Sequence, residues 1–125
     1  MKYTVSITRE GDAWLAGVPD VEGAHTFARS IDVLLKSIRE VIILMDDLPE
    51  DAEPDLNLEY NFDNELVAKA FEIGRARVEL AAREAELASA TADVIQELNR
   101  NGFTVRDSAR LLEMTPGRVS QIANG

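Results

Sequence analysis

The C-terminal end of the chain places polar side chains on one face of a predicted helix. Residues 116–125 read PGRVSQIANG, in which Val119 and Ile122 lie three positions apart on an apolar side. The opposite side holds small or polar residues, namely Gly117, Arg118, Ser120, Gln121 and Asn124. An arginine can bind guanine through two hydrogen bonds, and glutamine or asparagine can bind adenine in the same way. This combination predicts a helix that reads base edges in the major groove of DNA.

Thr115 and Pro116 mark the start of this helix. Threonine is a good N-cap, and proline suits the first helical position because its missing N–H has no partner to lose there. The free backbone N–H groups of such a helix start, together with the threonine hydroxyl, suit a phosphate oxygen. We therefore expect Thr115 to contact the DNA backbone.

A second short helix is predicted directly before the first, from Val105 to Glu113, with Thr104 as its N-cap. Its buried face is expected to contain Val105, Ala109 and Leu112. The small side chain of Ala109 would let the two helices cross closely.

The two helices are joined by about three residues, which is the connection of a helix-turn-helix. Glu113 occupies a turn position where glycine is common, and a left-handed backbone costs a non-glycine residue about 1 kcal/mol there. Arg106 and Arg110 lie on the earlier helix, where contacts to the DNA backbone usually fall. Residues 102–125 thus predict a helix-turn-helix DNA-binding module, and a hairpin used only for packing is the alternative. Three local arginines provide few phosphate contacts, so we expect two copies of the module on a palindromic site.

Residues 64–101 predict one long helix, which Gly102 would end. They contain one glycine, no proline and many Ala, Glu and Arg residues. An aliphatic residue recurs at every seventh position, at Leu66, Ile73, Leu80, Leu87 and Val94. Such a repeat is typical of a coiled coil, so we expect these residues to join two copies of the chain into a homodimer or a higher oligomer. The alternatives are a helix folded back on the preceding domain, or two helices broken at Gly74.

Residues 1–63 predict a small α/β domain. Apolar and polar residues alternate over residues 3–9 and 13–18, and a shorter strand is expected at residues 25–29. The period then changes to that of a helix over residues 30–46, with Ser30 as its N-cap. Alternation returns over residues 56–62. The order β-β-β-α-β followed by helices places the chain in the α+β class, with one helix packed on a small sheet.

The negative charge is concentrated in this first domain. The 125 residues carry a net charge of −10, and residues 1–63 contain 14 acidic and 5 basic side chains. Residues 102–125 contain 2 acidic and 3 basic ones, so only this end can approach phosphates without strong repulsion. Six of the acids lie in a predicted loop, DDLPEDAEPD: Asp46, Asp47, Glu50, Asp51, Glu53 and Asp55. We expect them either to form a solvated loop or to bind a basic protein partner.

The first domain resembles the HicB-like antitoxin family over about residues 2–62. The resemblance is carried by YTVSITREGDAWLAGVPDVEGAHTFA, by the aliphatic helix that ends in VIILM, and by the acidic loop and strand that follow. The tract from Pro19 to Thr26 is longer and less regular than the corresponding family segment. The resemblance implies a truncated ribonuclease-H-like sheet without nuclease activity, which binds and blocks a small basic toxin that cleaves messenger RNA. It also implies that the antitoxin, alone or with its toxin, represses its own operon.

An enzyme is not expected. The predicted strands carry few carboxylates, since Glu10 and Asp12 lie in a turn and Glu59 stands alone. A single histidine, His25, and the absence of cysteine argue against a metal site, and no cofactor is expected. Trp14 is expected in the core, with a partner contact as the alternative. The sequence has neither a signal-peptide pattern nor a membrane-spanning run, so we expect a cytoplasmic protein.

The sequence therefore predicts an antitoxin that binds a cognate toxin protein and operator DNA. A stand-alone helix-turn-helix transcription regulator, with a ligand- or protein-binding front domain, is one alternative. A purely structural dimer module is the other.

Overall fold

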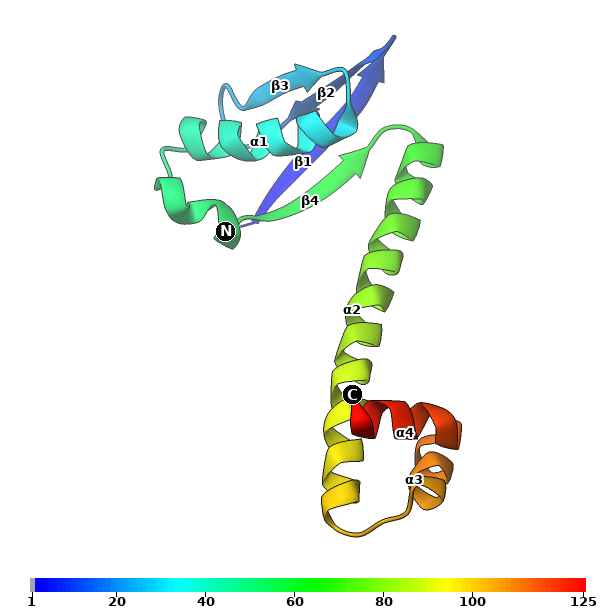
Figure 1. Cartoon of the computed structure of the whole chain (residues 1–125). Coiled ribbons are helices and arrows are strands. Elements are labelled where there is room, and N and C mark those ends of the chain that lie inside the picture. The colour runs from blue at the N-terminus through cyan, green and yellow to red at the C-terminus, as the bar shows by residue number, and fades with distance from the viewer. Residues whose placement is uncertain (1) are drawn as a thin grey trace. The chain divides into compact units, whose positions relative to one another are not determined.

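The computed structural model describes residues 2–125, except for the side chains of residues 53–55. The described chain is α+β, with a four-stranded mixed sheet and four α-helices, one of them long. It divides into two compact units, the first ending at Glu72 and the second running from Ile73 to Gly125 (Figure 1). Each unit has its own hydrophobic core.

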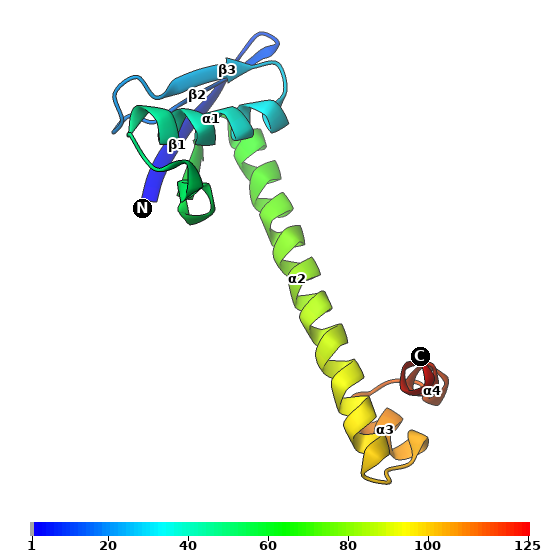
Figure 2. The same ribbon diagram turned by 60° about the vertical axis from the view of Figure 1, so that its left-hand side comes forward.

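The first unit is built on β1 (Lys2–Glu10), β2 (Ala13–Gly17), β3 (His25–Ala28) and β4 (Asn57–Phe62). The strand order is β3-β2-β1-β4, in which β1 pairs antiparallel with β2 and parallel with β4. The helix α1 (Ile31–Met45) lies between β3 and β4 in the chain and covers one face of the sheet (Figures 1 and 2). The predicted order β-β-β-α-β is therefore confirmed, with element ends within about two residues of those expected.

Apolar and polar residues alternate in β1, and apolar residues recur at helical spacing in α1. Both patterns place apolar side chains in the layer between the sheet and the helix. Val5 and Ile7 point to the helix-covered face of the sheet, and both are buried. Leu34, Ile38 and Ile42 recur every four residues on α1 and are 0% exposed. Burial of each such side chain contributes about 1.5–3 kcal/mol, so this layer is a main source of the stability of the first unit.

The two ends of α1 are set by local hydrogen bonds. The Ser30 hydroxyl accepts a hydrogen bond from the Val33 N–H at 3.2 Å, which confirms the predicted N-cap. At the other end Asp47 adopts a left-handed conformation (φ 51°), and the Leu48 N–H reaches back to the Ile43 carbonyl at 2.9 Å. The expected loop over residues 46–55 is only partly irregular, because Glu50–Asp55 forms a 3₁₀ helix, η1.

The long helix α2 spans Glu65–Arg100 without a break at Gly74, so the two-helix alternative is wrong. The Asn64 side chain caps it by accepting a hydrogen bond from the Val67 N–H at 3.0 Å. Within the first unit, the Phe71 ring packs against Tyr60 and Phe62, with centroid distances of 5.3 and 5.0 Å. These ring contacts place the beginning of α2 beside β4.

The second unit contains the rest of α2 together with α3 (Val105–Leu112) and α4 (Pro116–Asn124). Ile95, Ala109 and Val119, one from each helix, are each 2% exposed and form its buried core. In the described chain, no helix is both long enough and apolar enough to cross a membrane.

Candidate nucleic-acid interface

The connection between α3 and α4 is set by Glu113. This residue has φ 55° and ψ 46°, and the following Met114 N–H returns to the Ala109 carbonyl at 2.9 Å. The hydrogen bond satisfies a carbonyl that the last turn of α3 would otherwise leave without a partner. Glu113 therefore adopts the left-handed conformation that the sequence predicted for this position, although it is not a glycine.

Both short helices begin on the threonines that the sequence identified. The Thr104 hydroxyl accepts from the Asp107 N–H at 3.1 Å, and the Thr115 hydroxyl accepts from the Arg118 N–H at 3.2 Å. Pro116 occupies the first position of α4. A capping threonine uses an oxygen lone pair, so the Thr115 hydroxyl hydrogen can still be donated to a phosphate.

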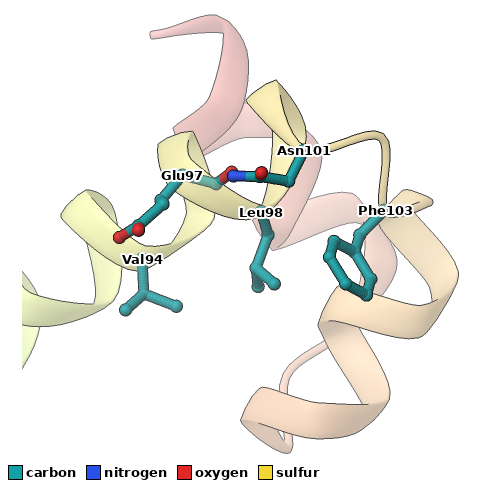
Figure 3. Close-up of a pocket in the computed structure, with 5 residues that line it drawn as sticks. All are labelled: Val94, Glu97, Leu98, Asn101 and Phe103. Atoms are coloured by element: carbon teal, nitrogen blue, oxygen red, sulfur yellow. The ribbon is translucent and has the colours of Figure 1, made fainter.

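The end of α2 turns the chain toward α3 in the same manner. Gly102 has φ +83°, its N–H binds the Asn99 carbonyl at 3.2 Å, and the Phe103 N–H binds the Leu98 carbonyl at 3.1 Å. Figure 3 shows the Leu98 and Phe103 side chains on one side of this turn, where they line a groove of about 340 Å³ with Val94, Glu97 and Asn101. The predicted role of Gly102 in ending the long helix is confirmed.

The buried face of α3 differs from the predicted one at one position. Ala109 is buried and Leu112 packs against the core as expected, but Val105 is 38% exposed and Ser108 is buried in its place. Val105 begins α3 and lies in its first turn, far from the Leu112 end where Met114 joins the core. The expectation for Val105 was therefore wrong, because the helix is too short for its pattern alone to fix its rotation.

Gln96 holds α4 against α2 and was missed by the sequence reasoning. Its side-chain amide donates to the carbonyls of Ile122 and Ala123, each at 3.2 Å. The last carbonyls of a helix have no partners within the helix. A polar residue beside buried Ile95, close to a helix end, is the sequence signal that could have identified it.

The outer face of α4 carries the predicted DNA-contacting residues. Arg118 and Gln121 are exposed and hydrogen-bond to each other at 3.2 Å, and the Asn124 amide donates to half-buried Ser120 at 3.4 Å. Gly117 is also exposed, and a Cβ added there would meet nothing within 4 Å. These side chains form one polar surface. The hydrogen bonds between them are exposed, so hydrogen bonds to a ligand can replace them at little cost in free energy.

The predicted phosphate-contacting arginines of α3 are both exposed. Arg106 has no ion pair among the described residues, whereas Arg110 forms one with Glu113 at 2.9 Å. Such an exposed pair contributes little to stability. Both guanidinium groups are therefore accessible to an anion.

The charge of the chain is divided between the two units. Residues 73–125 carry seven basic and seven acidic side chains, whereas residues 1–72 carry six basic and sixteen acidic ones. The second unit is thus neutral and the first carries the whole net charge of −10. Only the second unit can approach a polyanion without net repulsion.

The acidic segment after α1 has structural as well as exposed members. Asp46 accepts a hydrogen bond from the Tyr3 hydroxyl at 2.5 Å, which raises the pKa of Tyr3, and burial raises it further. Asp47 ends α1 with its left-handed backbone, and Glu50 and Asp51 are exposed. The side chains of Glu53 and Asp55 lie outside the described part of the structure.

An apolar stripe follows α2. It consists of Leu66, Ile73, Leu80, Leu87 and Val94, with exposed fractions of 74, 56, 57, 67 and 41%. A row of large apolar side chains exposed to this extent is a surface that a partner can cover.

Trp14 and His25 lie in the sheet. The Trp14 ring is half-buried against the core, with the Arg9 guanidinium 5.4 Å from its centroid, and His25 is exposed on β3. Over residues 2–125, leaving aside the side chains of residues 53–55, no three His, Cys, Asp or Glu residues are grouped to hold a metal ion.

Comparison with known proteins gave no match, whether with family models, with curated proteins or with solved structures.

Proposed function

We propose that the second unit is a helix-turn-helix that binds DNA, and that the protein is an antitoxin which represses its own operon. The observation that carries this proposal is the pair of capped helices α3 and α4, joined through left-handed Glu113, with a polar outer face on α4. In a helix-turn-helix the second helix lies in the major groove, and its N-terminal residues contact base edges. Arg118 is in the first turn of α4, so its side chain would reach a base edge if α4 is the recognition helix.

The surroundings of Arg118 agree with this role. Pro116 has no N–H and the Thr115 cap takes that of Arg118, so the Gly117 N–H and the Thr115 hydroxyl are the groups at the start of α4 that would donate to a phosphate. Gly117 has no side chain, so a DNA backbone can approach α4 closely. Arg106 and Arg110 on α3 would bind neighbouring phosphates, because both are exposed. A hairpin that served only for packing has no need of this polar face.

The first unit would bind the cognate toxin. Its net charge of −10 favours a small basic protein, and complementary charge mainly raises the rate and specificity of association. Glu50 and Asp51 are the described exposed carboxylates of the acidic segment. The resemblance to HicB-like antitoxins, which rests on residues 2–62, adds that such a toxin would be a ribonuclease acting on messenger RNA and that the sheet is a truncated ribonuclease-H-like one.

A stand-alone regulator that senses a small molecule is the second candidate. Such a regulator would need a ligand cavity between α1 and the sheet. The side chains that meet there, including Ile7, Leu34 and Ile38, are at most 1% exposed and pack on one another. The density of this core favours a protein ligand on the outside of the first unit.

DNA binding is tested with three single variants on DNA from upstream of the gene. Arg118→Ala should weaken binding by about 1–3 kcal/mol and relax the sequence preference, whereas Arg106→Ala should weaken all sequences equally. Lys36→Ala removes one positive charge from the first unit and should leave DNA binding unchanged. An Arg118→Ala protein with wild-type affinity and preference would contradict the proposed role of α4.

Toxin binding is tested by expressing the intact operon and purifying this chain. A small basic protein should co-purify, and reversing charge at Glu50 and Asp51 to lysine should weaken the complex. Purification of the chain without such a partner would contradict the antitoxin part of the proposal and leave the DNA-binding part standing.

A further inference from the structure

Two charged side chains interrupt the apolar stripe in the second unit. Arg77 lies between Ile73 and Leu80, and Glu84 lies between Leu80 and Leu87. Residues three and four positions apart are neighbours on a helix, and those around Arg77 and Glu84 are all Ile, Leu, Gly or Ala. Neither charge forms an ion pair with any described residue. If the stripe is covered, both charges need a partner from outside the helix.

A second copy of the chain provides that partner in only one orientation. A parallel pair of helices with two-fold symmetry is in register, so Arg77 would face Arg77 and Glu84 would face Glu84. Like charges opposite each other in a covered seam cost several kcal/mol. An antiparallel pair centred between residues 80 and 81 places each Arg77 opposite the Glu84 of the other copy. The same register covers Leu80 and Leu87, which are 57 and 67% exposed in the single chain.

We infer that two copies of this chain associate through antiparallel α2 helices, and that this pairing sets the spacing of their two α3–α4 pairs. The spacing of the α3–α4 pairs matters only if the proposed DNA-binding function holds, whereas the pairing itself is argued from the apolar stripe and the charges of α2. It identifies the occupant of the stripe as a second copy of the chain.

The position of α3 and α4 on α2 agrees with this orientation. Ile95, which holds them, follows Val94 of the stripe directly, and successive helical residues point about 100° apart. The helices α3 and α4 therefore lie about a quarter turn away from the stripe, on one side of α2 (Figures 1 and 2). The two-fold axis of an antiparallel pair is perpendicular to the plane of the two helices. It therefore brings both α3–α4 pairs to the same face, whereas a parallel pair would place them on opposite faces.

The spacing follows from the rise of the helix. Ile95 lies about 14.5 residues from the centre of the pair, so the two Ile95 residues are about 44 Å apart along the helix axis at 1.5 Å per residue. Half-sites read by paired helix-turn-helix modules lie about 34–36 Å apart, one turn of DNA. Arg118 shares a groove with Glu84, Leu87 and Ala88, so the start of α4 lies nearer the centre of the pair than Ile95 does. Antiparallel α2 helices would thus present both α4 helices to one side of a duplex, closer together than the two Ile95 residues.

A groove beside the stripe agrees with the same register. It has a volume of about 570 Å³ and lies between α2 and the α3–α4 pair. Leu87, Ala88 and Thr91 face Leu112, Met114 and Ile122 there, and the charged Glu84 and Arg118 also line the groove. When Arg77 lies opposite Glu84, residue 73 lies opposite residue 88. The Ile73 side chain of the second copy, 56% exposed in the single chain, would therefore lie beside the Leu87 and Ala88 side of this groove.

Disulfide cross-linking tests the orientation directly, because the chain has no cysteine of its own. The double variant Ile73→Cys/Ala88→Cys should form a cross-linked dimer on oxidation, and neither single variant should do so. Both positions are exposed on α2, so neither substitution removes a core contact. A cross-linked dimer from Ile73→Cys alone would show a parallel pair, and a double variant that stays monomeric would show that α2 does not pair. Either result overturns the inference.

Charge reversal gives an independent readout by sedimentation. Arg77→Glu should raise the dimer dissociation constant by about tenfold or more, and Arg77→Glu/Glu84→Arg should restore it. In a parallel pair, Arg77→Glu would only replace one like-charged contact by another and leave the constant unchanged. Neither this measurement nor the cross-link uses DNA. The α2 helices can therefore fail to pair while DNA binding by the second unit stands, and they can pair in a protein that does not bind DNA.

Discussion

Replacement of Ile95 by alanine should release α3 and α4 from α2 while leaving the first unit intact. Ile95 is 2% exposed, and it shares the small core of the second unit with Ala109 and Val119. Removing three buried carbon groups costs about 2.4 kcal/mol in lost burial at 0.8 kcal/mol each. The cavity left behind brings the expected loss to about 3 kcal/mol, within the range of 2–5 kcal/mol typical of this change. A core of three buried residues has little other stability to offset such a loss.

The two units can be followed separately in one sample. Trp14, the only tryptophan, packs on the core of the first unit, so its fluorescence reports urea unfolding of that unit alone. Amide hydrogen exchange of Val119 and Ile122 reports the second unit. In Ile95→Ala we expect these amides to exchange about a hundredfold faster, as about 3 kcal/mol requires, with an unchanged fluorescence midpoint.

Leu80→Ala is the matched control, because it removes a similar aliphatic side chain that is 57% exposed on the same helix and does not line the groove beside α3 and α4. It should leave the exchange of the α4 amides unchanged in the monomer. Unaltered protection of α4 in Ile95→Ala would refute the assignment of this core. A shifted fluorescence midpoint would refute the independence of the two units.

Two further predictions concern strain and pH. Glu113→Gly relieves the strain of the left-handed backbone and should make the second unit about 1 kcal/mol more stable than Glu113→Ala does. Both variants lose the exposed ion pair with Arg110, but the alanine variant keeps the strain. Thermal unfolding in which the alanine variant is equally or more stable would contradict this explanation. Tyr3→Phe should lower the free energy of unfolding of the first unit by about 1 kcal/mol at pH 8, because it removes the hydrogen bond to Asp46. The pKa of Tyr3 is raised in the folded chain, so wild type keeps this advantage below pH 10, the ordinary tyrosine pKa, and loses it as the pH rises further. Urea unfolding at pH 8 and pH 11 checks the sign, and a difference that grows at high pH would be inconsistent with it.

The regular elements could be predicted because their patterns are long or have specific end signals. Alternation over residues 3–9 predicted β1, and the spacing of Leu34, Ile38 and Ile42 predicted α1. Thr104, Thr115 and Gly102 marked helix ends because a capping side chain or a positive φ is a local requirement. These features depend only on neighbours in the chain.

Features that depend on contacts between distant residues could not be predicted in the same way. Ser108 is buried in place of Val105 because the packing of α4 and α2 sets the rotation of α3. Gln96 acts on carbonyls 26 and 27 residues away, which no local pattern records. Asp46 and Asp47 were expected in a solvated loop or in contact with a partner, yet one accepts the Tyr3 hydroxyl and the other ends α1. In the candidate interface, the polar face of α4 was visible in the sequence, but the hydrogen bond between Arg118 and Gln121 was not.

Hydroxyl-radical footprinting of the full chain on DNA from upstream of its gene tests the central claim most directly. We predict two protected segments whose centres lie about one helical turn of DNA apart, on one side of the duplex, and loss of both segments with Arg118→Ala. Uniform cleavage at low salt, with a chain that is folded by circular dichroism, would contradict DNA binding by the second unit.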